Sequence, residues 1–260
     1  MSNFKKILFL FCLTASVNLS GSSCGNPAAP ALIQEGMLIP DTVGVNVRME
    51  LENTYTENER LVFRRAYLDQ QFAEFKASGR LSTGAIIFNV RERADFYVKS
   101  GPQQLVCSFL QAGNRYCMKS KARPAWQGGA KIIVAEIQDW TFTIDGRYVY
   151  FHAKADEFLS SGAPLGVSRI RFCQQGWQAS GGISYSTGLI TPYAGFLIRN
   201  TKLHIKHTPF FEEKPIKTTQ KHKGGLFVGA SLCTGSYFFL SCEVRLINER
   251  SFSFVWALRF

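Results

Sequence analysis

Few residues in this sequence have the types and spacing that catalysis or metal binding needs. His204 and His207 are three positions apart, which in a β-strand places their side chains on opposite faces, so they cannot share a metal ion. The acidic residues between positions 136 and 157 are too scattered to suggest a catalytic pair, and no G-x-G-x-x-G phosphate-binding loop is present. We therefore predict a protein that is not an enzyme and that uses no metal and no cofactor.

Cysteine is the second residue type with chemistry of its own. Six cysteines follow the predicted export signal: Cys24, Cys107, Cys117, Cys173, Cys233 and Cys242. An even number of cysteines in an exported chain suggests disulfides, either within one chain or between chains. No C-x-x-C pair is present, so a zinc ribbon or a thioredoxin-like motif finds no support. Cys24 and Cys117 lie outside the predicted strands and are our candidates for disulfides between chains.

The start of the chain is typical of a targeting segment. The pair Lys5-Lys6 is followed by a mostly apolar stretch over residues 7–19 and by small residues at 21–23, where cleavage is expected. We predict a signal peptide over residues 1–23 and a single domain over residues 24–260. A mature chain with an N-terminal cysteine also leaves a lipoprotein open, although the site has glycine where a lipobox prefers leucine.

The elements that position the remaining residues are predicted from a period of two, which is clearest at the C-terminus. One face of the last segment carries Phe252, Phe254, Trp256, Leu258 and Phe260. Successive side chains of a strand point to opposite faces, so this segment presents a wide apolar face, as a lipid-facing strand does. The same five residues resemble the signal by which outer-membrane proteins enter the barrel assembly machinery. Aromatic belts at the two membrane interfaces are expected from Trp126, Trp140, Trp177 and Trp256.

The repeated alternation predicts an all-β fold, a transmembrane antiparallel β-barrel of the outer-membrane type with about twelve strands (ten to sixteen). The expected strands cover residues 43–53, 83–91, 93–101, 103–112, 129–139, 142–153, 165–174, 177–188, 193–206, 224–233, 236–247 and 251–260. Residues 54–82 and 208–223 are expected to be the longest connections on the outer side.

Charged residues alternate with apolar ones in several of these strands, and we expect the charged side to line a lumen. The candidates are Arg169, Arg171, Lys202, His204, Lys206, Glu243 and Arg245. Five of these seven are fixed cations, which predicts a preference for anions. The net charge of +11 also suits lipopolysaccharide phosphates, so contact with lipid headgroups remains open for the same side chains. Nucleic acid is not an expected partner of an exported chain.

Four short motifs resemble the chlamydial major outer membrane protein family. Residues 25–30 (GNPAAP) resemble its mature N-terminus, and residues 176–195 resemble its central W-Q-A-S…S-Y…T-P-Y-x-G region. Residues 243–260 resemble its E-T-R-L-I-D/N-E-R…F-R-F end, and a weaker likeness covers residues 88–95. The resemblance implies a barrel porin, trimeric in the family, that also serves as a structural protein of a disulfide-linked envelope. The family's cysteine-rich N-terminal segment is missing here.

Two hypotheses follow from the residues and the resemblance. The first is an outer-membrane porin that passes ions and small polar solutes by diffusion, prefers anions and adds to a disulfide-stabilised envelope. The second is a mainly structural, disulfide-linked envelope protein whose small barrel is filled by side chains, because barrels of about eight strands have filled interiors. Expected partners are ions, small solutes, outer-membrane lipid or lipopolysaccharide, the assembly machinery, a homotrimer and other disulfide-linked envelope proteins.

Overall fold

The computed structural model of the chain describes residues 23–32, 44–63, 72–111, 113–166, 169–208, 215–233, 238–247 and 249–259. Most of the predicted signal peptide and the predicted final residue of the assembly signal, Phe260, lie outside these residues. No helix among the described residues is long and apolar enough to cross a membrane.

Long strands make up nearly all of the described chain. Their bounds are β1 (Val45–Phe63), β2 (Phe72–Val90), β3 (Ala94–Gln111), β4 (Asn114–Ser120), β5 (Arg123–Ile137), β6 (Trp140–Ser160), β7 (Ala163–Pro164), β8 (Arg171–Tyr185), β9 (Ile190–Lys206), β10 (Ile216–Gln220), β11 (Gly224–Cys233), β12 (Phe238–Leu246) and β13 (Ser251–Arg259). The only helix in the described residues is the short α2 (Ala29–Leu32).

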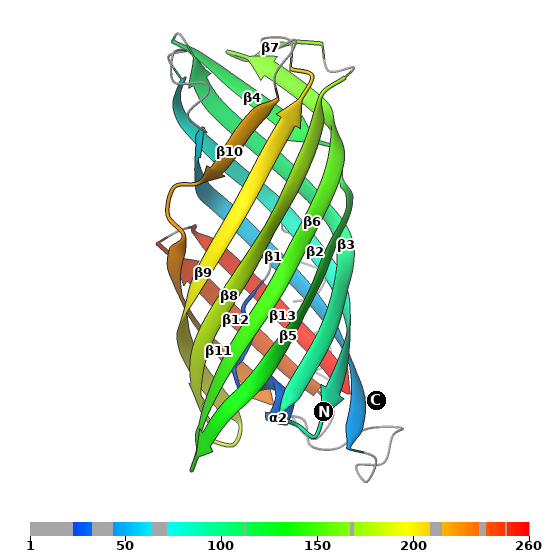
Figure 1. Ribbon diagram of the computed structural model, residues 1–260, viewed down its shortest axis with the longest axis vertical. Helices are drawn as coiled ribbons and strands as arrows, with labels where there is room; N and C mark the ends of the chain where they lie inside the picture. The colour runs from blue at the N-terminus through cyan, green and yellow to red at the C-terminus, as the bar shows by residue number, and fades with distance from the viewer. Residues whose placement is uncertain are drawn as a thin grey trace, which may run out of the picture.

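The strands close into one antiparallel barrel (Figure 1). β13 pairs with both β12 and β1, so the sheet has no free edge there. β4 and β5 both pair with β3 and β6, so these two short strands share one position in the wall, one after the other along its length. In the same way, β10 and β11 share the position beside β9. With the two-residue β7 left aside, the wall has ten strand positions. The predicted all-β, outer-membrane type of barrel is therefore confirmed.

The ten strand positions lie at the lower end of the predicted range of ten to sixteen, and the central value of twelve counted two strands twice. Residues 93–101 and 103–112 form one strand, β3, and residues 171–174 and 177–185 of the two predicted strands that cover 165–188 belong to another, β8. Both strands continue through crowded pairings that only glycine fits: a Cβ at Gly101 would lie 2.0 Å from the Ser82 carbonyl oxygen. The glycine therefore permits close backbone approach and does not mark a turn.

The barrel has two unlike ends. Short connections, such as those between β2 and β3 and between β5 and β6, lie at the end near the termini (Figure 1). Strands β12 and β13 stop well below the other end, where β1 pairs directly with β10. The wall thus narrows from ten strands in the lower half to eight in the upper half. The predicted connection over residues 54–82 was wrong, because β1 and β2 continue through most of it as the upper wall.

The pattern of side chains reverses halfway along the strands, most clearly in β6. Its first part exposes Trp140, Phe142, Ile144, Tyr148 and Tyr150 on the outside and turns Thr143, Asp145 and Arg147 inward. Its last part exposes His152, Lys154 and Asp156 on the outside and turns Phe151, Ala153 and Ala155 inward. The lower half is therefore built like a membrane barrel, and the upper half like a water-soluble one.

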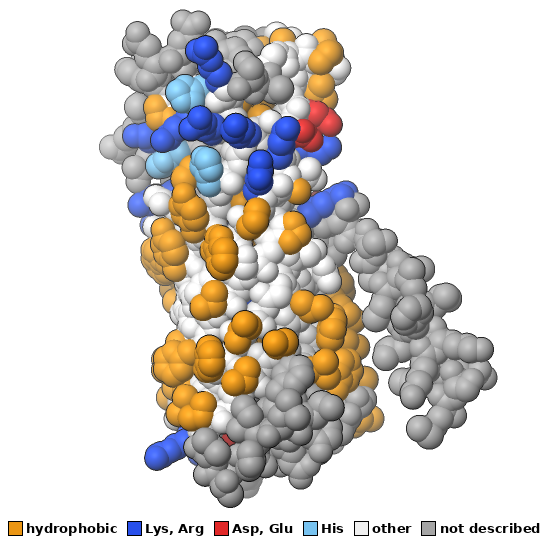
Figure 2. All heavy atoms as spheres, turned by 90° about the vertical axis from the view of Figure 1, so that its right-hand side faces the viewer, with side chains coloured by type: hydrophobic (Ala, Val, Ile, Leu, Met, Phe, Trp, Pro, Cys, Tyr) orange, Lys and Arg blue, Asp and Glu red, His pale blue; other side chains and the backbone are white. Residues whose placement is uncertain are grey.

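The ten-residue step from the first to the last outer aromatic residue of β6 spans about 24 Å of membrane if the strand is tilted by roughly 45°. This length matches the apolar band of outer-membrane barrels. Figure 2 shows the band of hydrophobic side chains over the lower barrel and a belt of Lys, Arg and His above it. Trp126, Trp140 and Trp177 are exposed on the outside of the barrel, and Trp256 is half-buried.

A single apolar cluster fills the upper half of the barrel. Its members come from the inward face of every strand position there: Leu61, Phe75, Ala77, Leu81, Leu105, Cys107, Phe109, Tyr116, Met118, Ala125, Phe151, Ala153, Ala155, Phe158, Ile170, Phe172, Leu203, Ile205 and Ile216. The ring of Phe109 on β3 stacks on Phe75 of the neighbouring β2 and on Tyr116 of the neighbouring β4. Eight strands leave room only for side chains, so this upper cluster closes the barrel.

Candidate functional site

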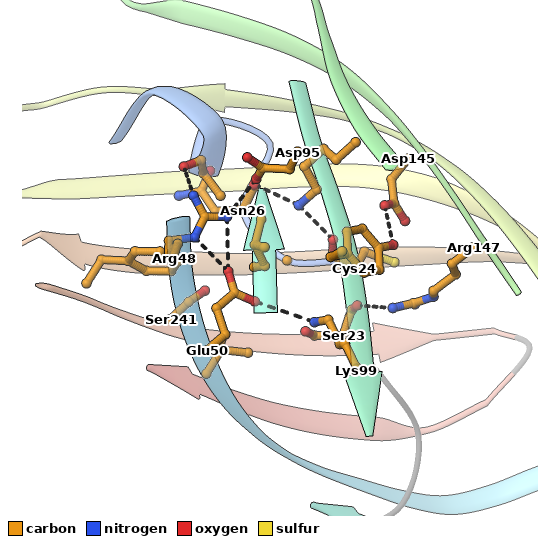
Figure 3. Close-up of a pocket in the computed structure, with 17 residues that line it drawn as sticks. Ser23, Cys24, Asn26, Arg48, Glu50, Asp95, Lys99, Asp145, Arg147 and Ser241 are labelled. Atoms are coloured by element: carbon orange, nitrogen blue, oxygen red, sulfur yellow. Dashed lines mark hydrogen bonds and ion pairs between the residues drawn. The ribbon is translucent and has the colours of Figure 1, made fainter. Parts of the chain in front are cut away.

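The lower half of the barrel contains a polar lumen that is occupied by the start of the described chain. Residues 23–32 are here called the plug segment, and most of its side chains over residues 23–30 are buried against side chains of the surrounding wall (Figure 3). Asn26 shapes this segment, because its side-chain oxygen accepts a hydrogen bond from the Ala28 amide at 2.8 Å, as in an Asx turn. The segment therefore enters the lumen as a compact turn followed by one helical turn.

Three cationic side chains of the wall hold the plug segment by its carbonyl groups. Lys131 Nζ of β5 donates to the carbonyl oxygens of Cys24 and Asn26, both at 3.0 Å. Arg48 of β1 donates to the Ala29 carbonyl at 2.9 Å, and Arg147 of β6 donates to the carbonyl of Ser23. Charged donors make stronger hydrogen bonds than neutral ones, so these contacts fix the segment firmly.

Two carboxylates bind the opposite groups, the amides of the same segment. Glu243 of β12 accepts hydrogen bonds from the amides of Cys24 at 2.8 Å and Gly25 at 2.9 Å. Glu52 of β1 accepts one from the Ser23 amide. Because these wall residues come from strands on different sides of the barrel, the plug segment links the wall across its interior.

The same cations and carboxylates also pair with one another around the wall. Arg48 lies 2.6 Å from Asp95, and Lys99 lies 2.8 Å from Glu52. Higher in the lumen, Glu249 lies 2.6 Å from Arg199. The inward cations of the described chain are Arg48, Lys99, Lys131, Arg147, Arg199 and Arg245, and the inward carboxylates are Glu50, Glu52, Glu59, Asp95, Asp145, Glu243 and Glu249. The positive charge of these cations and the negative charge of these carboxylates nearly balance, as burial of paired ions requires.

Little space remains in this lumen. One cavity beside the plug segment has a volume of about 30 Å³ and is lined by Cys24, Arg48, Glu50, Lys99 and neighbouring side chains (Figure 3). A second cavity of about 30 Å³ lies between Gln103, Gln127 and Gln174. Each has room for about two water molecules.

The plug segment lies close to one glycine of β8. A Cβ at Gly182 would lie 2.7 Å from Cγ of Pro27 and 3.1 Å from the ring of Phe227. Any other residue there would push against the proline ring. Gly182 thus provides the gap in which the plug segment lies.

The structure corrects most of the predicted lumen residues. Arg169, Arg171, Lys202, His204 and Lys206 lie on the outer surface of the upper barrel, while their neighbours Phe172, Leu203 and Ile205 point inward. The prediction assumed that charged faces always line the lumen, but above the membrane the apolar face is the buried one. Only Glu243 and Arg245 lie in the lumen. The predicted anion preference therefore loses its basis, because it relied on cations that face outward.

The six described cysteines are all free thiols. Cys24, predicted to link chains, is buried in the lumen and its sulfur accepts a hydrogen bond from Gln178, so it cannot reach another chain while the plug segment stays in place. Cys117 is half-buried on the outer face of β4 in the upper barrel. Burial raises the pKa of the Cys117 thiol, and it raises that of Cys107 in the upper cluster much further.

The predicted assembly signal lies on β13, with Phe252, Phe254, Trp256 and Leu258 on its outer face and small residues inward. The charged lumen residues of β1 and β6 were missed, although the sequence carried their signal. Arg48, Glu50 and Glu52 alternate with apolar residues. The position of the plug segment was missed as well, and no local pattern indicates it.

No family model and no curated protein matches the chain. Among solved structures, the outer membrane protease OmpT from Escherichia coli is similar with a TM-score of 0.50 and 10% identity, covering 83% of this chain and 96% of that one. An outer membrane channel from Pseudomonas putida F1 is similar with a TM-score of 0.45 and 9% identity, covering 83% of this chain and 95% of that one. The translocator domain of the autotransporter NalP from Neisseria meningitidis is similar with a TM-score of 0.44 and 10% identity, covering 90% of this chain and 91% of that one.

At these identities the likeness concerns the fold alone. The inverted pattern along the strands, the apolar band and the likeness to OmpT agree on one conclusion: the chain has the fold of an outer-membrane β-barrel.

Proposed function

We propose that this chain is a closed, mainly structural barrel of the bacterial outer membrane. The observation that carries the proposal is the interior, which is filled from end to end of the described barrel by the plug segment below and the upper cluster above. A hydrated ion would have to displace charged contacts such as that between Cys24 and Glu243 and then cross an apolar core. A closed barrel anchors and fills a membrane without making it permeable.

Disulfide links to neighbouring envelope proteins are part of the proposed role. Cys117 supports it best, because it faces outward above the apolar band and is not bonded to any of the other described cysteines. Its thiol has a raised pKa, so oxidation at neutral pH is slow and needs a partner held close by.

Non-reducing gel electrophoresis of envelopes tests this role. We expect higher-mass species without reductant, and we expect the Cys117→Ser variant to lose them while Cys107→Ser keeps them, since Cys107 is fully buried. A chain that runs only as a monomer without reductant would contradict the cross-linking role.

A second function, that of a porin, is favoured by the charged lumen of the lower half, which lines up Arg, Lys and Glu side chains as water-filled channels do. It requires that both the plug segment and the upper cluster move aside. Electrical recordings separate the two functions, because only a porin passes current.

A further inference from the structure

The upper barrel carries cations that stand directly beside one another on neighbouring strands. In the register of β6, β8 and β9, Lys154 is opposite Arg171, and Arg171 is opposite Lys206. Like charges directly opposite each other destabilise a sheet. Lys202 and Lys217 extend the group on β9 and β10. These five residues, here called the basic belt, lie on the outward face of their strands. Figure 2 shows a belt of Lys, Arg and His side chains above the apolar band.

The charges of the basic belt are not neutralised by the protein as far as the structure describes it. None of the five belt residues forms an ion pair with a described carboxylate, whereas Lys119 on the nearby β4 pairs with Glu157 at 3.2 Å. The lumen cations Arg48, Lys99, Arg199 and Arg245 likewise have acidic partners. A row of unneutralised cations on adjacent strands therefore calls for anions from outside the chain.

A pocket lies within the belt. It has a volume of about 300 Å³ and is lined by Lys154, Arg169, Ile170, Arg171 and His207. Ile170 is buried, while the two arginines and the lysine are exposed, so the pocket offers several N–H donors around a small apolar floor. Guanidinium groups bind phosphate through paired hydrogen bonds, and lysine adds a compact charge.

The height of the belt shows where such a phosphate would come from. On β6, Tyr150 is the last lipid-facing aromatic residue, and Lys154 follows four residues later, about 13 Å along the tilted strand. Below the belt, Trp177 of β8 and Ile198 of β9 expose apolar surface. The belt thus lies at the headgroup level of the membrane leaflet on this side, with apolar surface beneath it for acyl chains.

We propose that the basic belt and its pocket bind the phosphate groups of a phosphorylated glycolipid in the outer leaflet. The lipid's phosphate lies between Lys154, Arg169 and Arg171, and its acyl chains cover Trp177 and Ile198. The bound anion removes the repulsion between the opposed cations, so it also stabilises β6, β8 and β9. This site is independent of whether the barrel is closed or conducts.

The test uses the full chain in lipid nanodiscs that contain either a bisphosphorylated glycolipid or its dephosphorylated form. We expect the wild-type chain to enrich the phosphorylated lipid, and the double variant Lys154→Gln/Arg171→Gln to bind it about tenfold more weakly. The matched control is Arg80→Gln/Arg115→Gln, which removes two exposed cations on β2 and β4, away from the belt. Heat-modifiable gel migration establishes that all variants are folded.

Three results would overturn the proposal. The first is equal binding of the two lipid forms by the wild-type chain. The second is an equal loss of binding in the control variant. The third is displacement of the bound glycolipid by inorganic phosphate or by a single-stranded DNA oligonucleotide, since the belt would then be a general anion site.

Discussion

At the scale of single residues, the structure makes the plug segment depend on a few charged side chains and one glycine. Arg48, Lys131 and Arg147 bind its carbonyls, and Glu52 and Glu243 bind its amides. Buried charges are costly unless paired, so the wall and the segment satisfy each other. This reciprocity predicts that loosening the segment exposes groups that are now hidden, Cys24 first among them.

The glycine that accommodates the plug segment gives a direct test. In a chain whose other cysteines are alanine, we expect Gly182→Val to raise the rate of maleimide labelling of Cys24 at least about tenfold, because the new side chain collides with Pro27. Gly146→Val is the control, since a Cβ there meets nothing within 4 Å. Equal labelling in the two variants would mean that the segment is not held at this position.

The raised pKa of Cys117 predicts a pH dependence of its reactivity. The thiolate is the reactive form, and burial shifts its formation above the ordinary thiol pKa of 9.0. Alkylation of Cys117 is therefore expected to be slow at pH 7.5 and to keep rising as the pH passes 9, measured by mass spectrometry of the folded chain. A rate that levels off below pH 9 would contradict the burial of this thiol.

At the scale of elements, the reversal within each long strand explains what could and what could not be predicted. The period of two identified strands and the barrel, and it placed Glu243 and Arg245 correctly in the lumen. The same period led to the wrong orientation for Arg171 and Phe172: Arg171 was predicted to face the lumen, but it faces outward and Phe172 faces inward. Alternation alone does not say which face is buried. The missing information was the height of each residue relative to the membrane.

The reversal predicts that neighbouring residues of β6 contribute very differently to stability. Phe151 is fully buried in the upper cluster, and His152 is exposed beside it. We expect Phe151→Ala to lower the free energy of unfolding by about 3–5 kcal/mol and His152→Ala to change it by less than about 0.5 kcal/mol. Urea unfolding of the two variants in the same detergent checks this. Similar losses in both would contradict a packed upper core.

At the scale of the whole molecule, the barrel combines a membrane-embedded half with a polar lumen and a projecting half with an apolar core. The change from ten to eight strands makes this possible, because the narrower end can be filled by side chains alone. Membership of the chlamydial family, a trimeric assembly and a non-enzymatic role stay predictions from the sequence. The outer-membrane type of barrel is established by its topology and its likeness to OmpT.

Single-channel recording of the unreduced, full-length protein in a planar bilayer tests the closed barrel most directly. Flotation with the lipid and heat-modifiable migration first establish that the protein is inserted and folded. We expect no stable current steps from the closed barrel, either in the wild-type chain or in Gly182→Val, since the upper cluster still closes the barrel when the plug segment is loosened. Stable, reproducible steps from the wild-type protein would contradict it and establish the porin in its place.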